Sequence, residues 1–345
     1  MRILYNPVTD AFFNLAAEEY LLRHEDEDVF ILWRNDNTVV IGRNQNTWAE
    51  VNVPYVTEHG ITVVRRLSGG GAVFHDLGNV NFTFLTARTG GRQIDFSRFT
   101  APIIRALASL GVRAEADGRN DILVGGAKIS GNAQCVFRRP DGTERLLHHG
   151  TLLYGADLSR LAAALVVRPE KLRAKGVASV RRRVTNLRGV PGFPPELTVE
   201  DFIAHLAREA SGVPGAAPAS LTEEETAGIR ALREEKYAAW EWNYGASGTH
   251  ETEYYARFPF GSVSAAYTAR RGVLERVRLY GDYFGTEPVS VLERALTGAR
   301  LRRDALVEAM TSAPVSVGDC IAGADAQTLA SLLLGELEPE TEIGG

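Results

Sequence analysis

The alternation of hydrophobic and polar positions along the chain predicts both helices and strands. Apolar residues at helical spacing, typical of helices that bury one face, occupy Leu15–His24, Phe99–Gly111, Leu158–Leu165, Thr198–Ser211 and Glu223–Trp240. Short runs of β-branched and aromatic residues, typical of strands, occupy Val29–Trp33, Thr38–Gly42, Ile61–Leu67, Asn79–Thr86, Asp121–Arg139 and Arg145–Gly155. This mixture predicts an α+β fold with mostly antiparallel sheets flanked by helices.

Turn residues between these runs predict how the strands pair. Asn35–Asn37 separates the first two strands, which we expect to form a hairpin, and the next two strands along the chain are expected to pair likewise. Pro140–Gly142 lies between the last two strands and indicates another hairpin. Asp157 is expected to cap the helix that follows.

The length and the loops predict two domains. A chain of 345 residues is long enough for about two domains, and a boundary near Ala246–Thr249 divides it into residues 1–248 and 249–345. The second is expected to be a smaller α+β accessory domain with two or three strands and two or three helices. Within the first domain, Arg168–Asn186 is basic and has no regular period, which predicts a long loop that is either functional or disordered.

Composition and charge limit the class of protein. Hydrophobic residues make up 45% of the chain and charged residues 23%, values typical of a globular protein with a sizeable core. The net charge of −5 gives no global attraction to nucleic acid, so an anionic partner must meet a local basic patch. No apolar run approaches the roughly 20 residues that span a bilayer, and no signal peptide is evident. Cys135 and Cys320 are too few for a disulfide framework. We therefore expect a soluble, cytoplasmic protein without membrane or nucleic-acid partners.

The stretch RRLSGGGAVFHD, residues 65–76, carries the strongest signal of chemistry. Three consecutive glycines, Gly69–Gly71, allow positive φ and close approach of a ligand, so that their N–H groups can face an anion, and Arg66 adds a fixed positive charge. The stretch lacks the pattern of a P-loop and lies between strands. The alternative is a flexible glycine turn flanked by arginines on a solvated edge.

Two further polar clusters flanked by glycines, residues 118–121 and 125–133, bracket one predicted strand. Lys128 lies in the second, and its flexible stem could bring a compact positive charge to a ligand oxygen, although an exposed strand lysine is the alternative. Only four of the 38 basic residues are lysines, which favours the functional interpretation. His148 and His149 are adjacent on a strand and must point to opposite faces, so a zinc site is rejected.

Taken in order, RRLSGGGAVFHDLGN, GRNDILV, KISGNAQ, HHGTLLYGADLSRL, KGVASVRRRVTNL and WEWNYG resemble the lipoate-protein ligase A family. The segments FNLAAEEY and LWRNDNTVVIGRNQN also match, and the C-terminal part resembles the family's accessory domain more loosely. The resemblance implies that residues 1–248 form a catalytic domain like those of class II biotin and lipoyl ligases, binding lipoate and ATP. It is strong because several motifs occur in the family's order.

The resemblance implies that ATP activates lipoic acid to lipoyl-AMP. The lipoyl group then passes to a lysine of a lipoyl domain, either in an E2 subunit of a 2-oxo acid dehydrogenase complex or in the H-type protein of glycine cleavage. Joining a carboxylate to an α-phosphate brings two anions together, so the site needs cations and N–H donors. Mg²⁺ is expected as a bridge. The segment Lys171–Asn186 is expected to close over the adenylate and exclude water; a solvated loop or a nucleic-acid patch is the alternative.

The resemblance also assigns residues. Lys128 is expected to contact lipoate and the α-phosphate as the catalytic residue. The expected ATP and adenylate site comprises Arg66, Gly69, Gly70, Gly71, Ala72, Val73, Phe74, Asn120, Asp121 and Lys128. The expected lipoate site comprises Lys128, Arg66, His75, His149 and Trp33. Asp121 is a candidate ligand of Mg²⁺, because hard cations prefer carboxylate oxygens. Trp33 and Phe74 could form an apolar channel, although aromatic residues on strands more often belong to the core.

Other functions remain open. An octanoyl or lipoyl transferase of the same fold would carry the acyl group on a cysteine without ATP, and Cys135 is the candidate. On a continuous strand, however, Cys135 would point away from the face that carries Lys128. A biotin ligase is disfavoured because its G-R-G-R-x-G-R loop is absent. A non-catalytic adenylate sensor could contact nucleic acid through Arg181–Arg183.

Overall fold

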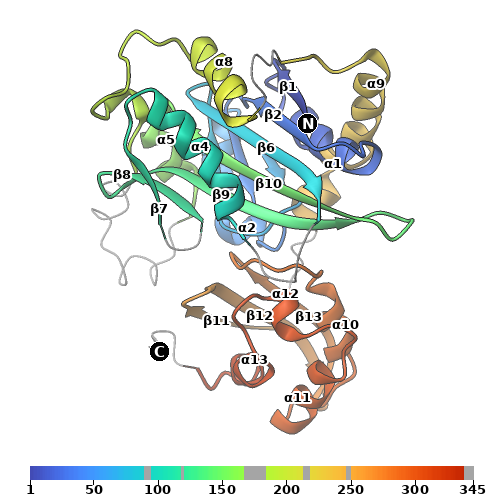
Figure 1. The fold of residues 1–345 in the computed structure, drawn as a ribbon. Coiled ribbons are helices and arrows are strands. Elements are labelled where there is room, and N and C mark those ends of the chain that lie inside the picture. Colours follow the sequence, from blue (N-terminus) through green and yellow to red (C-terminus); the bar gives the residue numbers. More distant parts are fainter. Residues whose placement is uncertain (89–94, 118–119, 167–183, 213–217, 246–249, 338–345) are drawn as a thin grey trace.

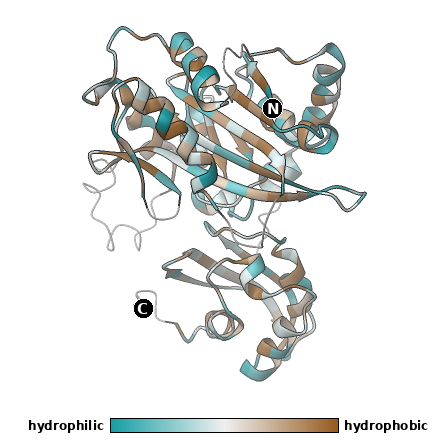
Figure 2. Ribbon diagram, in the orientation of Figure 1, coloured by the Kyte–Doolittle hydropathy of each residue, from teal (hydrophilic) through white to brown (hydrophobic). Residues whose placement is uncertain are grey.

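The computed structural model describes residues 1–88, 95–117, 120–166, 184–212, 218–245 and 250–337. Figure 1 shows two parts, a larger one formed by the residues up to 245 and a smaller one formed by residues 250–337. In Figure 2 hydrophobic residues run along the central strands and the loops are largely polar. The fold is α+β, as the sequence predicts. Within the described residues, no helix is long and apolar enough to span a membrane.

A seven-stranded sheet organises the larger part. Its strands are, in spatial order, β1 (Arg2–Asn6), β2 (Val29–Trp33), β6 (Asn79–Ala87), β10 (Glu144–Leu153), β9 (Ala127–Arg138), β8 (Asp121–Val124) and β7 (Ala114–Asp117). Only β1 and β2 run parallel; every other neighbouring pair is antiparallel. The expected hairpin around Pro140–Gly142 is present as β9 and β10, and Gly142 has the positive φ of 86° that its turn requires.

A second sheet of three strands, β4 (Thr62–Arg65), β3 (Thr38–Ile41) and β5 (Val73–His75), lies against the first. The predicted hairpin between the first two strands of the sequence pattern is therefore wrong, because β2 belongs to the large sheet and β3 to the small one. Every residue of β2 and β3 is buried, so each strand has partners on both sides and apolar neighbours on both faces. The turn at Asn35–Asn37 carries the chain from one sheet to the other.

The predicted pairing of the next two strands is also wrong. β4 lies in the small sheet and β6 in the large one. Between them the three-residue strand β5 pairs with β3, and it is too short to stand out as a strand in the sequence pattern. The glycine-rich stretch therefore connects β4 to β5 within the small sheet.

Helices cover both faces of the large sheet. α1 (Ala11–His24) and α9 (Glu223–Leu232) pack on one face, and α4 (Ser97–Ser109), α8 (Val199–Ala210) and the short η1 (Leu187–Gly189) pack on the other. α3 (Val53–Glu58) and α5 (Leu158–Ala164) pack against the small sheet instead, and the short α2 (Thr47–Glu50) precedes α3. Asp157 caps α5 as expected. The helix predicted over Glu223–Trp240 is α-helical only as far as Leu232. It continues as the π-helical η2 (Arg233–Tyr237), and a second π-helical segment, η3 (Glu241–Gly245), follows.

The two faces of the large sheet bury different clusters. On one face, Phe30, Phe82 and Phe84 pack with α4 and α8. On the other face, Ile31 and Trp33 pack with α1 and with apolar residues of the small sheet. Successive side chains of a strand point to opposite faces, so each strand contributes to both clusters. The second face is the one that carries the candidate site.

The smaller part has its own core. It consists of β11 (Thr252–Phe258), β12 (Gly261–Arg270), β13 (Val273–Gly281), α10 (Ser290–Leu296), α11 (Arg303–Thr311), α12 (Val317–Cys320) and α13 (Ala326–Leu333). The three strands form an antiparallel sheet whose buried residues pack with the helices. This part has one more helix than the sequence pattern indicates, the four-residue α12. The domain boundary at residues 248 and 249 lies outside the described residues and stays a prediction.

Candidate active site

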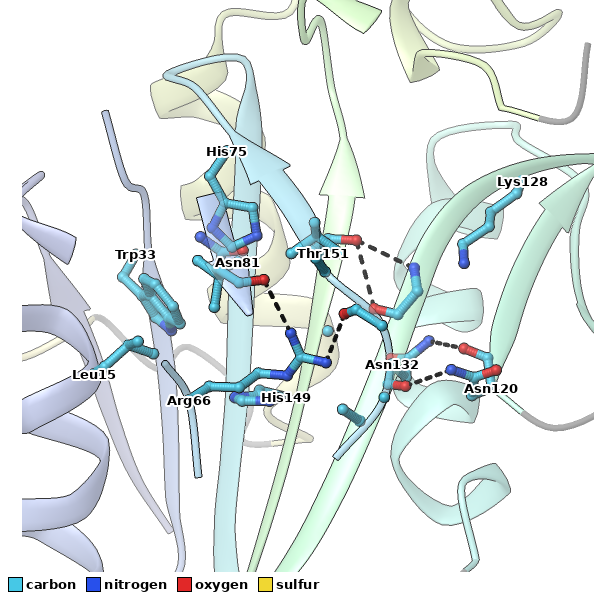
Figure 3. A pocket seen from close by; sticks show the side chains of 18 residues that line it. Leu15, Trp33, Arg66, His75, Asn81, Asn120, Lys128, Asn132, His149 and Thr151 are labelled. Carbon is cyan, nitrogen blue, oxygen red and sulfur yellow. Dashed lines mark hydrogen bonds between the residues drawn. The ribbon is translucent and has the colours of Figure 1, made fainter. Parts of the chain in front are cut away.

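A cavity lies on the face of the large sheet that the small sheet covers. It is lined by Leu15, Trp33, Val40, Arg66, Gly70, Gly71, Ala72, Val73, His75, Asn81, Asn120, Lys128, Gly131, Asn132, Ala133, His149, Gly150 and Thr151. Figure 3 shows Leu15, Trp33, His75 and Asn81 grouped at one end and Lys128 at the other, with Arg66 between them. One end of the cavity is therefore rich in apolar and aromatic side chains. At the other end, the flexible side chain of Lys128 brings a positive charge.

Arg66 holds the glycine-rich loop from inside. Its guanidinium donates to the carbonyl oxygens of Gly69 at 2.7 Å, Gly71 at 2.8 Å and Val40 at 3.2 Å. Burial lowers the pKa of Arg66 to about 10, so the group stays protonated at neutral pH. Gly70 has a φ of +88°, and a Cβ there would lie 3.0 Å from Nη2 of Arg66. The loop conformation and the position of Arg66 thus depend on each other.

The smaller part of the chain covers the outside of this loop. The N–H of Gly70 donates to the carbonyl oxygen of Tyr283 at 3.3 Å. A Cβ on Gly69 would lie 2.3 Å from the same oxygen, and one on Gly70 would lie 3.2 Å from the ring of Phe284. Glycine is therefore required at these two positions for the contact. In this arrangement the Gly70 N–H has a protein partner.

Arg65, the residue before Arg66, is also buried but faces away from the cavity. It donates to the carbonyl oxygens of Gly42, Arg43, Gln45, Trp242 and Asn243 and to the hydroxyl of Thr47. Burial lowers its pKa to about 10, and the carbonyl oxygens compensate the lost hydration. Arg65 thereby fastens the segment after β3 and the segment of η3 to the same strand, β4.

Lys128 lies on β9 and pairs with a carboxylate of the neighbouring strand. Its Nζ is 2.7 Å from Oδ1 of Asp121. A Cβ on Gly131 would lie 2.9 Å from this Nζ, so the glycine leaves room for the lysine side chain to lie along the strand. The carbonyl of Lys128 accepts from the N–H of Thr185 at 2.9 Å, next to a bridge with Val184. The described end of the predicted basic loop therefore lies beside Lys128; residues 167–183 of that loop lie outside the described residues.

Asn120 and Asn132 hold the turn beside Lys128. The Asn120 amide donates to the carbonyl of Asn132 at 2.7 Å, and the Asn132 amide donates to the carbonyl of Asn120 at 2.9 Å. Both side chains line the cavity. The exchange fixes the polar end of the cavity without using a charged group.

A buried chain of hydrogen bonds joins His149 to Trp33 on one side and to Ser68, next to the glycine-rich loop, on the other. Nδ1 of His149 lies 2.9 Å from Oε1 of Glu18, which also accepts from the Thr83 hydroxyl at 2.7 Å, and that hydroxyl accepts from Nε1 of Trp33 at 2.9 Å. Nε2 of His149 lies 2.6 Å from Oγ of Ser68. Glu18 is 1% exposed. Its carboxylate orients Trp33 and His149 together.

His75 points into the cavity from β5. Its Nδ1 lies 3.2 Å from Nδ2 of Asn35, whereas its buried Nε2 has no hydrogen-bond partner among the described residues. Burial, with the charge of Arg66, lowers the pKa of His75 to about 3, so the ring is neutral at neutral pH. The ring lies edge-on to Trp33, with 6.3 Å between centroids.

The cavity gathers most, but not all, of the residues that the sequence predicts. Of these, Trp33, Arg66, Gly70, Gly71, Ala72, Val73, His75, Asn120, Lys128 and His149 line it. Phe74 alternates with its neighbours and packs on the opposite side of β5, in a separate apolar cluster. Gly69 contacts Arg66 from outside the lining, and Asp121 reaches the cavity through its contact with Lys128. Sequence reasoning did not assign eight lining residues to the site: Leu15, Val40, Asn81, Gly131, Asn132, Ala133, Gly150 and Thr151. Gly131–Ala133 lie in a polar cluster that the sequence had singled out, and Asn81 gave a signal as a polar residue in an apolar strand.

The prediction that Cys135 points away from the face of Lys128 is wrong. β9 has a bulge at Ile129, because consecutive residues of β8 pair with Lys128 and Ser130. The extra residue shifts the alternation, so Cys135 shares the face of Lys128. Cys135 nevertheless packs into the core beside α1 and does not line the cavity. Burial raises the pKa of its thiol to about 12, which disfavours the thiolate.

The adjacent histidines do point to opposite faces. His149 lines the cavity, whereas His148 stacks on Phe99 with 4.7 Å between ring centroids. The two imidazoles therefore cannot share a metal ion, as expected from their spacing.

Comparison with protein families gives two matches that follow one another along the chain. Residues 10–211 match the lipoyl protein ligase A/B catalytic domain, and residues 248–335 match the bacterial lipoate protein ligase C-terminus. Lipoate–protein ligase 1 of Staphylococcus aureus is 42% identical over 85% of this chain and 88% of its own length. Lipoate-protein ligase LplJ of Bacillus subtilis is 39% identical over 88% of this chain and 91% of its own.

Solved structures resemble the fold. P. falciparum LipL1 in complex with lipoate has a TM-score of 0.78 and 23% identity, and the match covers 97% of this chain and 99% of that one. A bi-partite ligase from Thermoplasma acidophilum, described with its E2 lipoyl domain, has a TM-score of 0.61 and 29% identity over 73% of this chain and 98% of its own. A lipoate-protein ligase A bound with ATP has a TM-score of 0.58 and 27% identity over 71% and 98%.

Proposed function

Because this chain belongs to the lipoate–protein ligase family, we propose that its cavity is where lipoic acid and ATP react and where the lipoyl group is handed to an acceptor lysine. The enzyme is an ATP-dependent ligase. In the first step a lipoate carboxylate oxygen attacks the α-phosphorus of ATP, and pyrophosphate leaves. In the second step the ε-amine of the acceptor lysine attacks the acyl carbon, an amide forms, and AMP leaves.

One observation carries this proposal: Lys128 at one end and Arg66 in the middle line a cavity whose other end is rich in apolar and aromatic side chains. A carboxylic acid with a long apolar tail has this polarity. The tail would lie among Leu15, Trp33 and Val40, and the carboxylate would lie toward Lys128. Fixed cations there lower the cost of bringing a carboxylate and a phosphate together, and they gain most as charge builds on the phosphorus oxygens.

The nucleotide is expected at the polar end. Arg66, Gly69–Val73 and Asn120 are proposed to contact the adenylate, with the loop N–H groups as donors to its phosphate. Phe74 contributes only through its backbone, because its side chain packs elsewhere. Since Gly70 N–H donates to Tyr283, the phosphate would take the place of that carbonyl oxygen. The segment Lys171–Asn186, anchored beside Lys128 at its described end, is proposed to cover the adenylate.

Asp121 fits a magnesium ion that arrives with ATP. It offers carboxylate oxygens, the ligand type that Mg²⁺ prefers, and Asp117 pairs with it across the strands β7 and β8. Both residues line a second hollow between the larger and smaller parts. Bound Mg²⁺ would neutralise phosphate charge. Lys128 already pairs with Asp121, so this carboxylate would be shared between the lysine and the ion.

The acceptor is proposed to be a lipoyl domain, either of an E2 subunit of a 2-oxo acid dehydrogenase complex or of an H-type glycine cleavage protein. The Thermoplasma relative described with its E2 lipoyl domain supports the first class. The two free thiols fit a reducing compartment, which supports the cytoplasm as the site of the reaction.

The thioester transferase is the competing function, and the buried position of Cys135 disfavours it. A nucleophilic cysteine needs an accessible thiolate, but this thiol lies outside the cavity and its pKa is raised by burial to about 12. The related ligases at 42% and 39% identity also support the ATP-dependent reaction over a non-catalytic sensor.

The deciding experiment incubates the protein with lipoate, Mg²⁺ and an isolated lipoyl domain, with and without ATP, and weighs the domain by mass spectrometry. We expect the lipoyl mass increment only when ATP is present. An increment from an acyl thiol donor without ATP would indicate the transferase, and absence of any increment with ATP would refute the ligase assignment.

A further inference from the structure

Two buried N–H groups at the Trp33 end of the cavity have no protein partner. They are Nε2 of His75 and Nδ2 of Asn81, and neither has a hydrogen bond within the described residues. His75 is 3% exposed and Asn81 1% exposed, and both line the cavity. Figure 3 shows them near Trp33, far from Lys128. Buried polar groups are almost always paired, so two orphans in one place point to a ligand.

The hydrogen bonds around His75 fix which ring nitrogen carries the proton. Nδ2 of Asn14 donates to the carbonyl oxygens of Val8 and Arg34, both at 2.9 Å, which sets the orientation of that amide. Oδ1 of Asn35 also lies 2.9 Å from this nitrogen, so its two N–H groups are shared among three oxygens. With Oδ1 of Asn35 turned toward that donor, Nδ2 of Asn35 faces Nδ1 of His75 and donates to it. A ring nitrogen that accepts has no proton.

The proton of the neutral His75 ring is therefore on Nε2, the unpaired buried nitrogen of a side chain that lines the cavity. Burial keeps the ring neutral, because it lowers the pKa of His75 to about 3. Asn81 presents a donor in the same way. With Oδ1 of Asn81 accepting from Nδ2 of Asn79 at 2.9 Å, the NH₂ group of Asn81 and Oδ1 of Asn79 are both left without a partner among the described residues.

The surroundings make these donors selective. Both nitrogens are inaccessible to water in the free cavity, so each is an unpaired buried donor before the ligand binds. A plain alkyl tail leaves both donors unpaired, at the cost that an unpaired buried donor carries. A tail that carries its own acceptors can supply the missing partner.

We propose that His75 and Asn81, through these two donors, select an acyl tail that ends in hydrogen-bond acceptors, such as the two sulfurs of lipoate, over a plain alkyl tail such as octanoate. The inference rests on the proposed function, because it takes the carboxylate to lie at the Lys128 end. Sulfur is a weak acceptor, so the selection is the modest gain of a partner that lipoate offers and an alkyl tail does not. Asn35 is a positioning residue, since it holds the tautomer of His75.

The test compares kcat/KM for adenylate formation with lipoate and with octanoate, in the wild type and in His75→Phe and Asn81→Leu. Each substitution replaces a donor by an apolar group of similar size. We expect the preference for lipoate to fall severalfold, up to about tenfold, in each variant, because lipoate no longer supplies a partner to that donor. His148→Phe is the matched control: it removes another fully buried histidine with an unpaired ring nitrogen, but on the opposite face of the sheet. Because Nε2 of His148 lies 3.3 Å from Oδ1 of Asn132, which lines the polar end, this control is read as the ratio of kcat/KM for the two acids and not as an absolute rate.

The outcomes separate the two levels of inference. An unchanged preference in folded His75→Phe and Asn81→Leu would overturn the selection proposal, and so would an equal fall in His148→Phe. If the wild type makes no adenylate from either acid, the proposed function itself fails.

A second measurement needs no variant. In protein labelled with ¹⁵N-histidine, each protonated ring nitrogen is distinguished by its chemical shift, and the chain has only seven histidines. We expect the His75 proton on Nε2, with a larger change of its shift on adding lipoate than on adding octanoate. A proton on Nδ1, or equal changes with both acids, would contradict the proposal.

Discussion

The two ends of the cavity treat their polar groups in opposite ways. At the polar end each cation is already engaged by the protein: Lys128 pairs with Asp121, and Arg66 donates to carbonyl oxygens of the glycine-rich loop. At the other end, the N–H groups of His75 and Asn81 have no partner among the described residues. One end must exchange a protein partner for the ligand, and the other gains a partner from it.

Charge explains the difference. Burying an unpaired cation costs several times as much free energy as burying an unpaired neutral donor. The free protein can therefore contain an unpaired imidazole N–H, but not an unpaired guanidinium. The cations are consequently held in place before the ligand arrives, and exchange of partners among oxygens changes their energy little. The energy of the neutral donors depends instead on whether the ligand offers them a hydrogen-bond acceptor. Affinity is thus expected from one end and discrimination from the other.

The most severe test of the polar end is Lys128→Arg. The charge is kept, but a broad planar guanidinium replaces a compact ammonium where Asp121 and Gly131 enclose the Nζ atom. We expect ATP-dependent lipoyl transfer to fall about 10²-fold or more, the scale for losing one preorganised donor. Lys236→Arg is the control, because Lys236 makes a similar pair with Glu19 outside the cavity. Activity near the wild-type level in Lys128→Arg would show that charge alone suffices.

The next test disturbs the glycine-rich loop. In Gly70→Val the new side chain would meet Arg66 and Phe284 at a φ of +88°, so we expect pyrophosphate release with lipoate to fall about tenfold to a hundredfold. Gly142→Val introduces the same kind of strain at a φ of +86°, in a hairpin turn with open space around it. A loss of similar size in both variants would mean that global stability, and not the loop, is responsible.

A smaller effect is expected from pH at the uncharged end. The folded pKa of His75 is about 3, whereas an unfolded histidine titrates near 6.5, so between these values protons bind preferentially to the unfolded chain. Stability is full above pH 6.5 and falls as the pH drops toward 3. At pH 5.5, His75 should lower the free energy of unfolding by about 1.4 kcal/mol relative to pH 7.5.

His75→Phe lacks this contribution, so its loss of stability between pH 7.5 and 5.5 should be smaller by that amount. Urea unfolding followed by tryptophan fluorescence measures it, and all four tryptophans lie in the larger part of the chain. An identical loss in the variant and the wild type would show that His75 is charged, or solvated, in the folded protein. His148, whose pKa burial also lowers, contributes equally to both proteins.

The least effect is expected from Cys135→Ser. The thiol lies in the core beside α1, so the new hydroxyl should lower stability by about 1 kcal/mol and leave ATP-dependent transfer close to the wild-type rate. Intact-mass analysis after exposure to an acyl thiol donor provides the second readout. Loss of activity together with an acyl group on Cys135 of the wild type would favour the transferase.

Local patterns in the sequence predicted the parts of this molecule that local physics determines. The cap of α5, the hairpin around Pro140–Gly142 and the positive φ of Gly70 follow from residues within a few positions of one another. Strand pairing did not follow. β2 and β3 are adjacent in sequence but belong to different sheets, because their partners are supplied by β6, β4 and β5, far along the chain.

The candidate site divides in the same way. Motif order identified Arg66, Lys128 and the glycines, since their chemistry is visible in the residue types. The face of Cys135 was wrong because a single bulge at Ile129 reverses the alternation, and a bulge leaves no mark in an apolar pattern. The donors of His75 and Asn81 were invisible as a pair, because their lack of partners depends on every neighbour that folding brings together.

The bonds of Arg65 limit how far the smaller part of the chain can travel. By fastening η3 to β4, they fix the position from which the connection to β11 departs. From Gly245 to His250 there are five Cα–Cα steps, which span at most about 18 Å however the chain runs. The smaller part is therefore held near the glycine-rich loop by a short covalent connection. Because the two parts are covalently joined, the effective concentration of the smaller part at Gly70 does not fall when the protein is diluted. A nucleotide phosphate that binds the Gly70 N–H must therefore compete with the Tyr283 carbonyl at any protein concentration.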